Sequence, residues 1–230
     1  MGTVRPSQRI GSYEITPLTT GRFKENAYVV VHVATGDCLL VDPGAEPDFI
    51  GTYLRLHKLT PQKIVLTHGH FDHLGAVSAL MAQFLIPCQA HRLEERLVRQ
   101  AATYAFRYDR HGAPVTVPRD LAFFDGASDL DWNGRCVGVL PTPGHTAGSV
   151  ALVLDGAAAF VGDTLFYERI GPTTYPESDP AAIGPSVATL LDTLPPPCII
   201  FPGHGRPWSV ERARDWWSNL PGAPPSLAIF

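Results

Sequence analysis

Short apolar runs, separated by glycine, proline and polar residues, recur along the whole chain and predict many short strands and helices. Strands are expected at residues 10–18, 27–34, 38–42, 63–67, 121–124, 136–140, 149–154, 157–161 and 198–201. Apolar residues at helical spacing predict helices at residues 46–56, 72–85, 93–106, 181–194 and 209–218. This alternation of strands and helices is typical of the mixed α/β fold classes.

The segment after the third expected helix differs from its surroundings. Residues 107–118 are basic and aromatic and contain proline and glycine, which favours a loop. We expect this loop to form part of a lid-like region near residues 93–118. The chain shows no internal repeat and no long linker. Residues 1–230 are therefore interpreted as a single domain.

Composition and charge narrow the class of protein. Hydrophobic residues make up 45% of the chain, which is enough for a substantial core. The formal net charge of −4 and the pI of about 6.1 provide no electrostatic basis for binding nucleic acid or an anionic membrane. No apolar run approaches the roughly 20 residues of a membrane helix, and the N-terminus lacks the apolar segment of a secretory signal. We therefore expect a cytoplasmic protein with neither nucleic acid nor membrane as a partner, and the sequence sets no oligomeric state.

The four cysteines also favour a cytoplasmic protein. Cys38, Cys88, Cys136 and Cys198 are widely separated and form no Cys-x-x-Cys pair. Each lies beside apolar residues in a strand-like run, so we expect buried, reduced thiols.

Four of the apolar strands lead into side chains that can bind metal. Because ligands in α/β proteins gather at the carboxyl ends of strands, these side chains are expected to meet around two divalent ions. They are His68, His70, Asp72, His73, His145, Asp163 and His204. Taken singly, a histidine or aspartate at such a position could equally be a helix cap or a turn residue. Their joint occurrence after buried strands favours metal ligands.

The motifs around these side chains resemble those of the metallo-β-lactamase superfamily. Residues 67–73 (THGHFDH) are similar to its His-x-His-x-Asp-His signature, and residues 142–149 (TPGHTAGS) to its second histidine motif. Residues 162–166 (GDTLF) resemble the motif of the bridging aspartate, and residues 202–205 (PGHG) the last histidine motif. The resemblance covers roughly residues 10–210. It implies an α/β fold of the αββα sandwich type, with two mixed sheets flanked by helices and the metals at one edge.

An earlier motif, residues 40–44 (LVDPG), resembles the aspartate motif of the same superfamily. The resemblance implies that Asp42 lies behind the metal ligands and contacts them, without binding metal itself. An Asx turn before the Pro-Gly pair is the alternative interpretation.

Within the superfamily, residues 23–28 and 162–166 are similar to short glyoxalase II-like (hydroxyacylglutathione hydrolase-like) proteins and to persulfide dioxygenases. Those branches usually continue with Gly-Arg-Thr-Asp, where this chain has Gly-Pro-Thr-Thr at residues 171–174. The printed sequence ends soon after His204, so the helical domain with which longer glyoxalase II proteins hold glutathione is expected to be missing.

The resemblance implies roles for the seven ligands. His68, His70 and His145 would hold the first metal. The second metal would be held by Asp72, His73 and His204, with Asp163 bridging, so that Asp72 and Asp163 count as catalytic. Zinc is the first choice and iron or manganese also suit these ligands.

Two ions about 3.5–4 Å apart can share a hydroxide that attacks a carbonyl. Because a thiolate leaves readily while a lactam nitrogen must be protonated, we predict a hydrolase that cleaves a thioester or ester of a small molecule.

Substrate contacts are expected from two segments, the lid-like region and the turn after Asp163. Their charged and aromatic side chains could bind a carboxylate or phosphate, and an ordinary solvated loop is the alternative. These residues are Arg107, Tyr108, Arg110, His111, Tyr167 and Arg169.

Three other functions remain open. One is a persulfide dioxygenase-like oxidoreductase with a single iron held by His68, His145 and Asp163. Another is a lactonase that uses the same hydroxide. The third is a metal-binding domain without catalysis.

Overall fold

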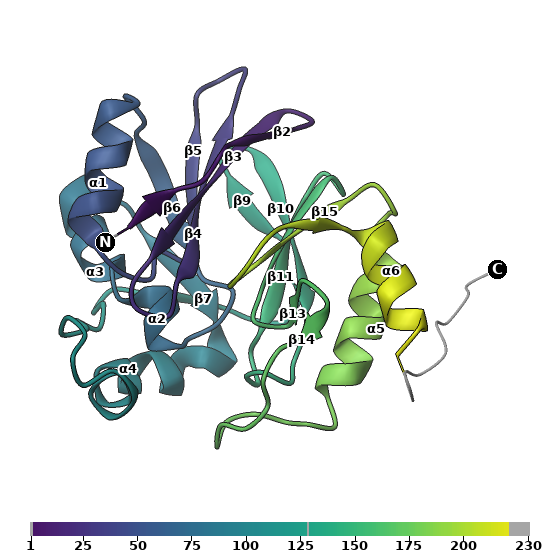
Figure 1. Cartoon of the computed structure of the whole chain (residues 1–230). Helices are drawn as coiled ribbons and strands as arrows, with labels where there is room; N and C mark the ends of the chain where they lie inside the picture. The colour runs from purple at the N-terminus through teal and green to yellow at the C-terminus, as the bar shows by residue number, and fades with distance from the viewer. Residues whose placement is uncertain (1, 128, 221–230) are drawn as a thin grey trace.

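Two mixed β-sheets pack face to face, and helices cover both outer faces, so the expected αββα sandwich is confirmed (Figure 1). The computed structural model describes residues 2–127 and 129–220. The first sheet contains β1 (Thr3–Val4), β2 (Gln8–Ile10), β3 (Tyr13–Thr20), β4 (Glu25–His32), β5 (Cys38–Val41), β6 (Pro61–Val65), β7 (Cys88–His91) and β8 (Ala122–Phe124). The second contains β9 (Leu130–Trp132), β10 (Arg135–Pro141), β11 (Val150–Leu154), β12 (Ala158–Gly162), β15 (Ile199–Pro202) and β16 (Trp208–Ser209).

The helices divide between the two outer faces. Core residues of the first sheet pack against α1 (Pro47–Leu56), α2 (Phe71–Leu74), α3 (Val77–Phe84) and α4 (Glu95–Tyr108), which follows the 3-10 turn η1 (Arg92–Glu94). Those of the second sheet pack against α5 (Ile183–Thr193) and α6 (Val210–Ser218). The short hairpin of β13 (Leu165–Phe166) and β14 (Arg169–Ile170) follows β12.

Strands buried on both faces explain the continuous apolar runs in the sequence. In β12, Ala158 and Phe160 point into the layer between the sheets, whereas Ala159 and Val161 point toward α5 and α6. Side chains alternate along a strand, so a strand covered on both sides has no polar face. The same alternation holds along β5, where every residue is buried.

Strand direction brings the expected metal ligands to one edge of the sandwich. In the first sheet β5 and β6 run parallel, so their carboxyl ends lie side by side. In the second sheet β10 and β12 are both antiparallel to β11, and β15 is parallel to β12. Consequently β10, β12 and β15 all point the same way, and the loops that follow them lie together.

One expected helix is broken in two. Residues 72–85 were predicted as one helix, but α2 ends at Leu74 and α3 begins at Val77. The break occurs because the Ala76 N–H donates to the carbonyl of Pro43 (3.0 Å) in the loop after β5. Gly75 lies so close to the Gly44 carbonyl that a Cβ there would overlap it.

The helix expected at residues 93–106 is α4, which ends at Tyr108 and packs its buried face on the first sheet, and the residues that follow it up to 118 are irregular. One further expectation, on the cysteines, needs correction. Cys38, Cys88 and Cys198 are buried free thiols, but Cys136 is exposed, because its neighbour Val137 faces the core and side chains alternate along β10.

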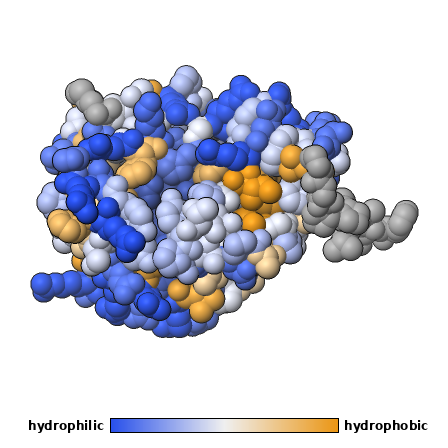
Figure 2. Space-filling model, turned by 60° about the horizontal axis from the view of Figure 1, so that its bottom comes forward, coloured by the Kyte–Doolittle hydropathy of each residue, from blue (hydrophilic) through white to orange (hydrophobic). Residues whose placement is uncertain are grey.

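The surface seen from below in Figure 1 is mostly hydrophilic, with its apolar residues gathered in a few patches (Figure 2). Across residues 2–127 and 129–220, no helix has the length and apolar character that crossing a membrane requires.

Candidate metal centre

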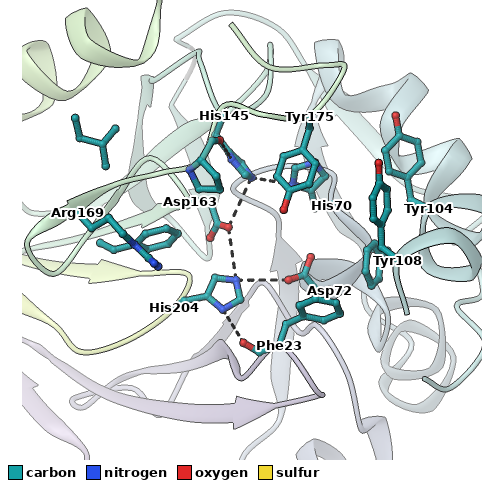
Figure 3. A pocket seen from close by; sticks show the side chains of 14 residues that line it. Phe23, His70, Asp72, Tyr104, Tyr108, His145, Asp163, Arg169, Tyr175 and His204 are labelled. Atoms are coloured by element: carbon teal, nitrogen blue, oxygen red, sulfur yellow. Dashed lines mark hydrogen bonds and ion pairs between the residues drawn. The ribbon is translucent and has the colours of Figure 1, made fainter. Parts of the chain in front are cut away.

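The segments that follow β6, β10, β12 and β15 bring the seven expected ligands to one place, with Asp72 and His73 on α2. Five of the seven, His70, Asp72, His145, Asp163 and His204, are seen in Figure 3. Three groups of three side chains present donor atoms within 4.8 Å of one another. One of them contains Asp42, His68 and His73. The first donor group is His68, His70 and His145, and the second donor group is Asp72, His73 and His204. These are the two sets that the motif resemblance implied for the first and second metal.

Asp163 lies between the two groups. Its Oδ1 is 3.3 Å from His73 Nε2, and its Oδ2 is 3.6 Å from His145 Nε2 and 3.5 Å from His204 Nε2. On the far side, His204 Nε2 is 3.5 Å from Asp72 Oδ2. One carboxylate therefore faces both groups at once.

Several buried atoms at this centre have no hydrogen-bond partner within the described residues. His68 Nε2, His73 Nε2 and Asp163 Oδ1 are all of this kind, since the last two lie 3.3 Å apart as an ion pair but form no hydrogen bond with each other. Buried polar atoms are nearly always bonded, so three such atoms around one point call for a ligand. Imidazole nitrogen and carboxylate oxygen suit a divalent transition metal, and the residues fit a metal site.

The electrostatic environment differs between the two groups. Burial, followed by the neighbouring histidines, lowers the pKa of His68 well below its usual value, and burial lowers the pKa of His145 to about 4. Although burial acts to lower them, the Asp163 and Asp72 carboxylates raise the pKa values of His73 and His204. Without metal, His68 and His145 are therefore neutral at pH 7, whereas His73 carries a proton and His204 keeps its proton to a higher pH than an ordinary histidine does.

Asp42 lies behind this centre. Its Oδ1 accepts the Thr67 N–H (2.7 Å), and its Oδ2 lies 3.1 Å from His73 Nδ1. The residue has φ of 47°, a left-handed conformation that turns the chain sharply at the end of β5. Because Asp42 holds Nδ1, the Nε2 of His73 faces Asp163.

Glu94 is a buried carboxyl that the motifs did not indicate. It accepts the backbone N–H groups of Gly69 and Gly148, each at 2.7 Å, and so joins the loop of His68 and His70 to the loop of His145. Burial raises the pKa of Glu94, and the two N–H groups oppose that shift. A sequence signal did exist, since Glu94 occupies the apolar face that Leu97 and Val98 define at helical spacing.

Three other side chains near the ligands were also missed. Tyr175 and Glu177, in the segment before α5, contact His70, and Tyr104 on α4 donates to Glu177. Tyr175 and Glu177 fall in an irregular segment whose sequence carries no periodic signal.

A cavity of about 500 Å³ opens beside the ligands. Its aromatic walls come from segments far apart in the chain, and Arg169 lies on the side opposite Tyr104 and Tyr108 (Figure 3). The aromatic lining residues are Phe23, Phe71, Tyr104, Tyr108, Phe166 and Tyr175. Of the expected substrate contacts, Tyr108 and Arg169 line this cavity.

The other expected substrate contacts lie elsewhere. Arg107 points over the Tyr108 ring at 5.5 Å, and Arg110 is exposed. His111 lines a separate, larger cavity beside α3. Tyr167 packs on Trp208. The sequence shows the types of these side chains, but the direction in which each one points depends on where α4 and the β13–β14 hairpin end.

Known proteins resemble this chain in sequence and in fold. The sequence profile described as metallo-beta-lactamase superfamily matches residues 20–204. The probable metallo-hydrolase YqgX of Bacillus subtilis (strain 168) is 32% identical over 199 residues, covering 86% of this chain and 93% of that protein. The hydroxyacylglutathione hydrolase GloC of Haemophilus influenzae is 29% identical over 194 residues, covering 84% of this chain and 90% of that protein.

Solved structures of the same fold also match this chain. BLEG-1, a B3 metallo-beta-lactamase, matches with a TM-score of 0.81 at 30% identity, over 87% of this chain and 96% of that one. TTHA1623 in a di-iron-bound form matches with a TM-score of 0.76 at 34% identity, over 86% and 96%. The profile match spans all seven expected ligands, and the fold and donor groups agree with it. The chain belongs to the metallo-β-lactamase superfamily.

Proposed function

We propose that this protein is a binuclear metal-dependent hydrolase that cleaves a thioester or ester of a small molecule. One observation carries the proposal: the Asp163 carboxylate faces His73 through one oxygen and both His145 and His204 through the other. A carboxylate between two groups of three donors is the arrangement that a pair of metal ions requires.

His68, His70 and His145 would hold one ion, Asp72, His73 and His204 the other, and Asp163 both. When bound, two such ions lower the pKa of coordinated water to near 7 and stabilise charge on the carbonyl oxygen under attack. Zinc is our first choice. Iron and manganese suit the same donors, and the related TTHA1623 is known in a di-iron-bound form.

The residues around the cavity would bind and orient the substrate. Phe23, Phe71 and Phe166 offer apolar surface for an acyl group. The Arg169 guanidinium, which lies 4.8 Å from the centre of the Phe166 ring, is placed to attract a carboxylate or phosphate on the substrate. Tyr175 supplies a hydroxyl beside the histidines.

The leaving group favours a thioester or ester over an amide. An amide nitrogen must be protonated as it departs, but the carboxyl groups lining the cavity, Asp72 and Asp163, are both assigned to metal. A thiolate needs no such acid, because a thiol has a pKa near 8.5. The relative named hydroxyacylglutathione hydrolase supports the same class.

We also propose that residues 1–230 act as one domain. The two sheets share a single core, in which Tyr28 of the first sheet contacts Phe160 and Phe201 of the second.

The test compares His204→Ala with unchanged protein after metal loading. We expect His204→Ala to lose most thioesterase activity while one metal stays bound, since His204 belongs to only one donor group. His57→Ala is the matched control, because His57 is exposed and stacks on Tyr53. The assay uses a panel of an acyl thioester of a small thiol, an aryl ester, a lactone and a β-lactam, with elemental analysis of each protein.

Two outcomes would contradict the proposal. Turnover of the lactone or β-lactam far above the thioester and ester would assign a different substrate class. Oxygen consumption by iron-loaded protein with a persulfide, retained in His204→Ala, would assign an oxidoreductase.

A further inference from the structure

The segment between β14 and α5 contacts two of the three histidines in the first donor group. The Pro172 carbonyl accepts from His145 Nδ1 (2.8 Å), and the Ser178 hydroxyl donates to the His145 carbonyl (2.8 Å). Five residues after Pro172, the Glu177 carboxylate places Oε1 at 2.7 Å from His70 Nε2. Residues 171–179 therefore hold both rings from the side opposite the donor atoms.

Glu177 is well suited to hold a charge here. Its side chain is 17% exposed, and its second oxygen accepts the Tyr104 hydroxyl (3.0 Å). Burial acts to raise its pKa, but the hydrogen bonds with His70, Tyr104 and the backbone together lower the pKa of Glu177 below the usual value. The group is therefore a carboxylate at neutral pH, and its two oxygens link α4 to the ligand His70.

These contacts decide which ring nitrogen is free for a ligand. A neutral histidine has one N–H, and a carboxylate or a carbonyl can only accept. His70 therefore donates from Nε2 to Glu177, and His145 donates from Nδ1 to Pro172. The two remaining nitrogens, His70 Nδ1 and His145 Nε2, lie 2.8 Å apart. When both rings are neutral with these tautomers, both nitrogens present lone pairs, and a cation between them would bind both.

We propose that Glu177 is the positioning residue for His70: it fixes the tautomer and the ring orientation that aim Nδ1 at the first metal, and its charge raises the basicity of that nitrogen. The inference rests on the assignment of His70 as a ligand in the proposed function. Asp42 has the equivalent position behind His73 in the other donor group. Glu177 should therefore control the first site and leave the second unaffected.

The test measures metal affinity, without turnover. Metal-free protein is titrated with Co²⁺ by absorption and with Zn²⁺ against a chelator, both alone and in a His204→Ala background that isolates the first site. We expect Glu177→Ala to weaken first-site binding by about tenfold to a hundredfold, with second-site affinity kept within about threefold. Glu177→Gln keeps an acceptor without the charge, so it should recover part of the loss and restore the Co²⁺ spectrum.

Two controls separate the carboxylate from its surroundings. Glu168→Gln changes an exposed glutamate that pairs with Arg212, and it should have no effect. Tyr104→Phe removes only the hydroxyl bound to Glu177, and first-site affinity should stay within about threefold.

Unchanged first-site affinity in Glu177→Ala would overturn the inference. So would an equal loss at both sites together with a lower Tm, or a Tyr104→Phe loss as large as that of Glu177→Ala. If the loaded protein cleaves no ester or thioester but Glu177→Ala still loses first-site affinity selectively, the proposed function fails and this inference stands.

Discussion

Replacing Glu94 tests whether one buried carboxylate holds the two loops of the first donor group together. Its two oxygens each accept one backbone N–H at 2.7 Å, from Gly69 between two ligand histidines and from Gly148 in the loop of the third. The residue is 1% exposed, so water does not replace a lost acceptor without rearrangement of the loops.

The expected loss follows from these two bonds. Glu94→Ala leaves two buried N–H groups without a partner, at about 1–3 kcal/mol each, or about 2–6 kcal/mol together. In a chain of this size each kcal/mol lowers the Tm by about 2–4 °C, so a loss of about 4 kcal/mol lowers it by about 8–16 °C. Glu94→Gln keeps one acceptor and sets an NH₂ group against the other N–H, so about half of that loss is expected.

The neighbouring Glu95 provides the control. It forms an exposed pair with Arg99 one helical turn away (2.6 Å), and Glu95→Ala should cost only about 0.3–0.5 kcal/mol. Thermal unfolding of the metal-free proteins by circular dichroism measures stability, and Zn²⁺ titration measures first-site affinity, which should also fall in Glu94→Ala. If Glu94→Ala melts within about 2 °C of Glu95→Ala, the two bonds do not stabilise the loops as argued.

Three more predictions concern the metal centre. Asp163→Asn should lower metal occupancy at both sites, because its oxygens face both donor groups, and elemental analysis that finds one tight metal unaffected would refute the bridging role. Binding of Zn²⁺ at pH 7 should release at least about one proton, because His73 has a pKa well above the usual value and must lose its proton to bind metal; His204, whose pKa is also raised, adds to the release. Calorimetry in buffers of different ionisation enthalpy measures the number of protons released, and a release of fewer than one proton would contradict the prediction. In metal-free protein these two histidines stabilise the fold below their ordinary pKa of about 6.5, and this stabilisation is lost as the pH rises through their raised pKa values. Gly203→Ala should weaken metal binding and cost about 1–3 kcal/mol, because its Cβ would overlap Asp163 Oδ1. Gly138→Ala, which meets only an ordinary contact at 3.5 Å, is the control for the unfolding and titration measurements.

Many of the strands could be predicted from the local pattern of apolar residues, because both faces of the central strands are covered. Strands β5 and β12 are apolar throughout, and β4 contains an apolar run at residues 27–31. Such runs mark buried strands whatever their neighbours are. Strand β7 was not predicted, since its four residues include Gln89 and His91. The sequence indicated the candidate ligands for the same reason. Each of them follows a buried strand, at the point where the chain turns and a polar side chain is not part of the core.

What the sequence by itself determined was thus the set of donor side chains and the strands that carry them, since both depend on residues adjacent in the chain. Only the tertiary structure decided which polar groups support those donors. Glu94 and Glu177 contact the segments of the candidate ligands from far away in sequence, because their hydrogen bonds cross between elements. The helix break at Ala76 has the same origin: its N–H bonds to Pro43, and a hydrogen bond to another loop leaves no trace in local periodicity.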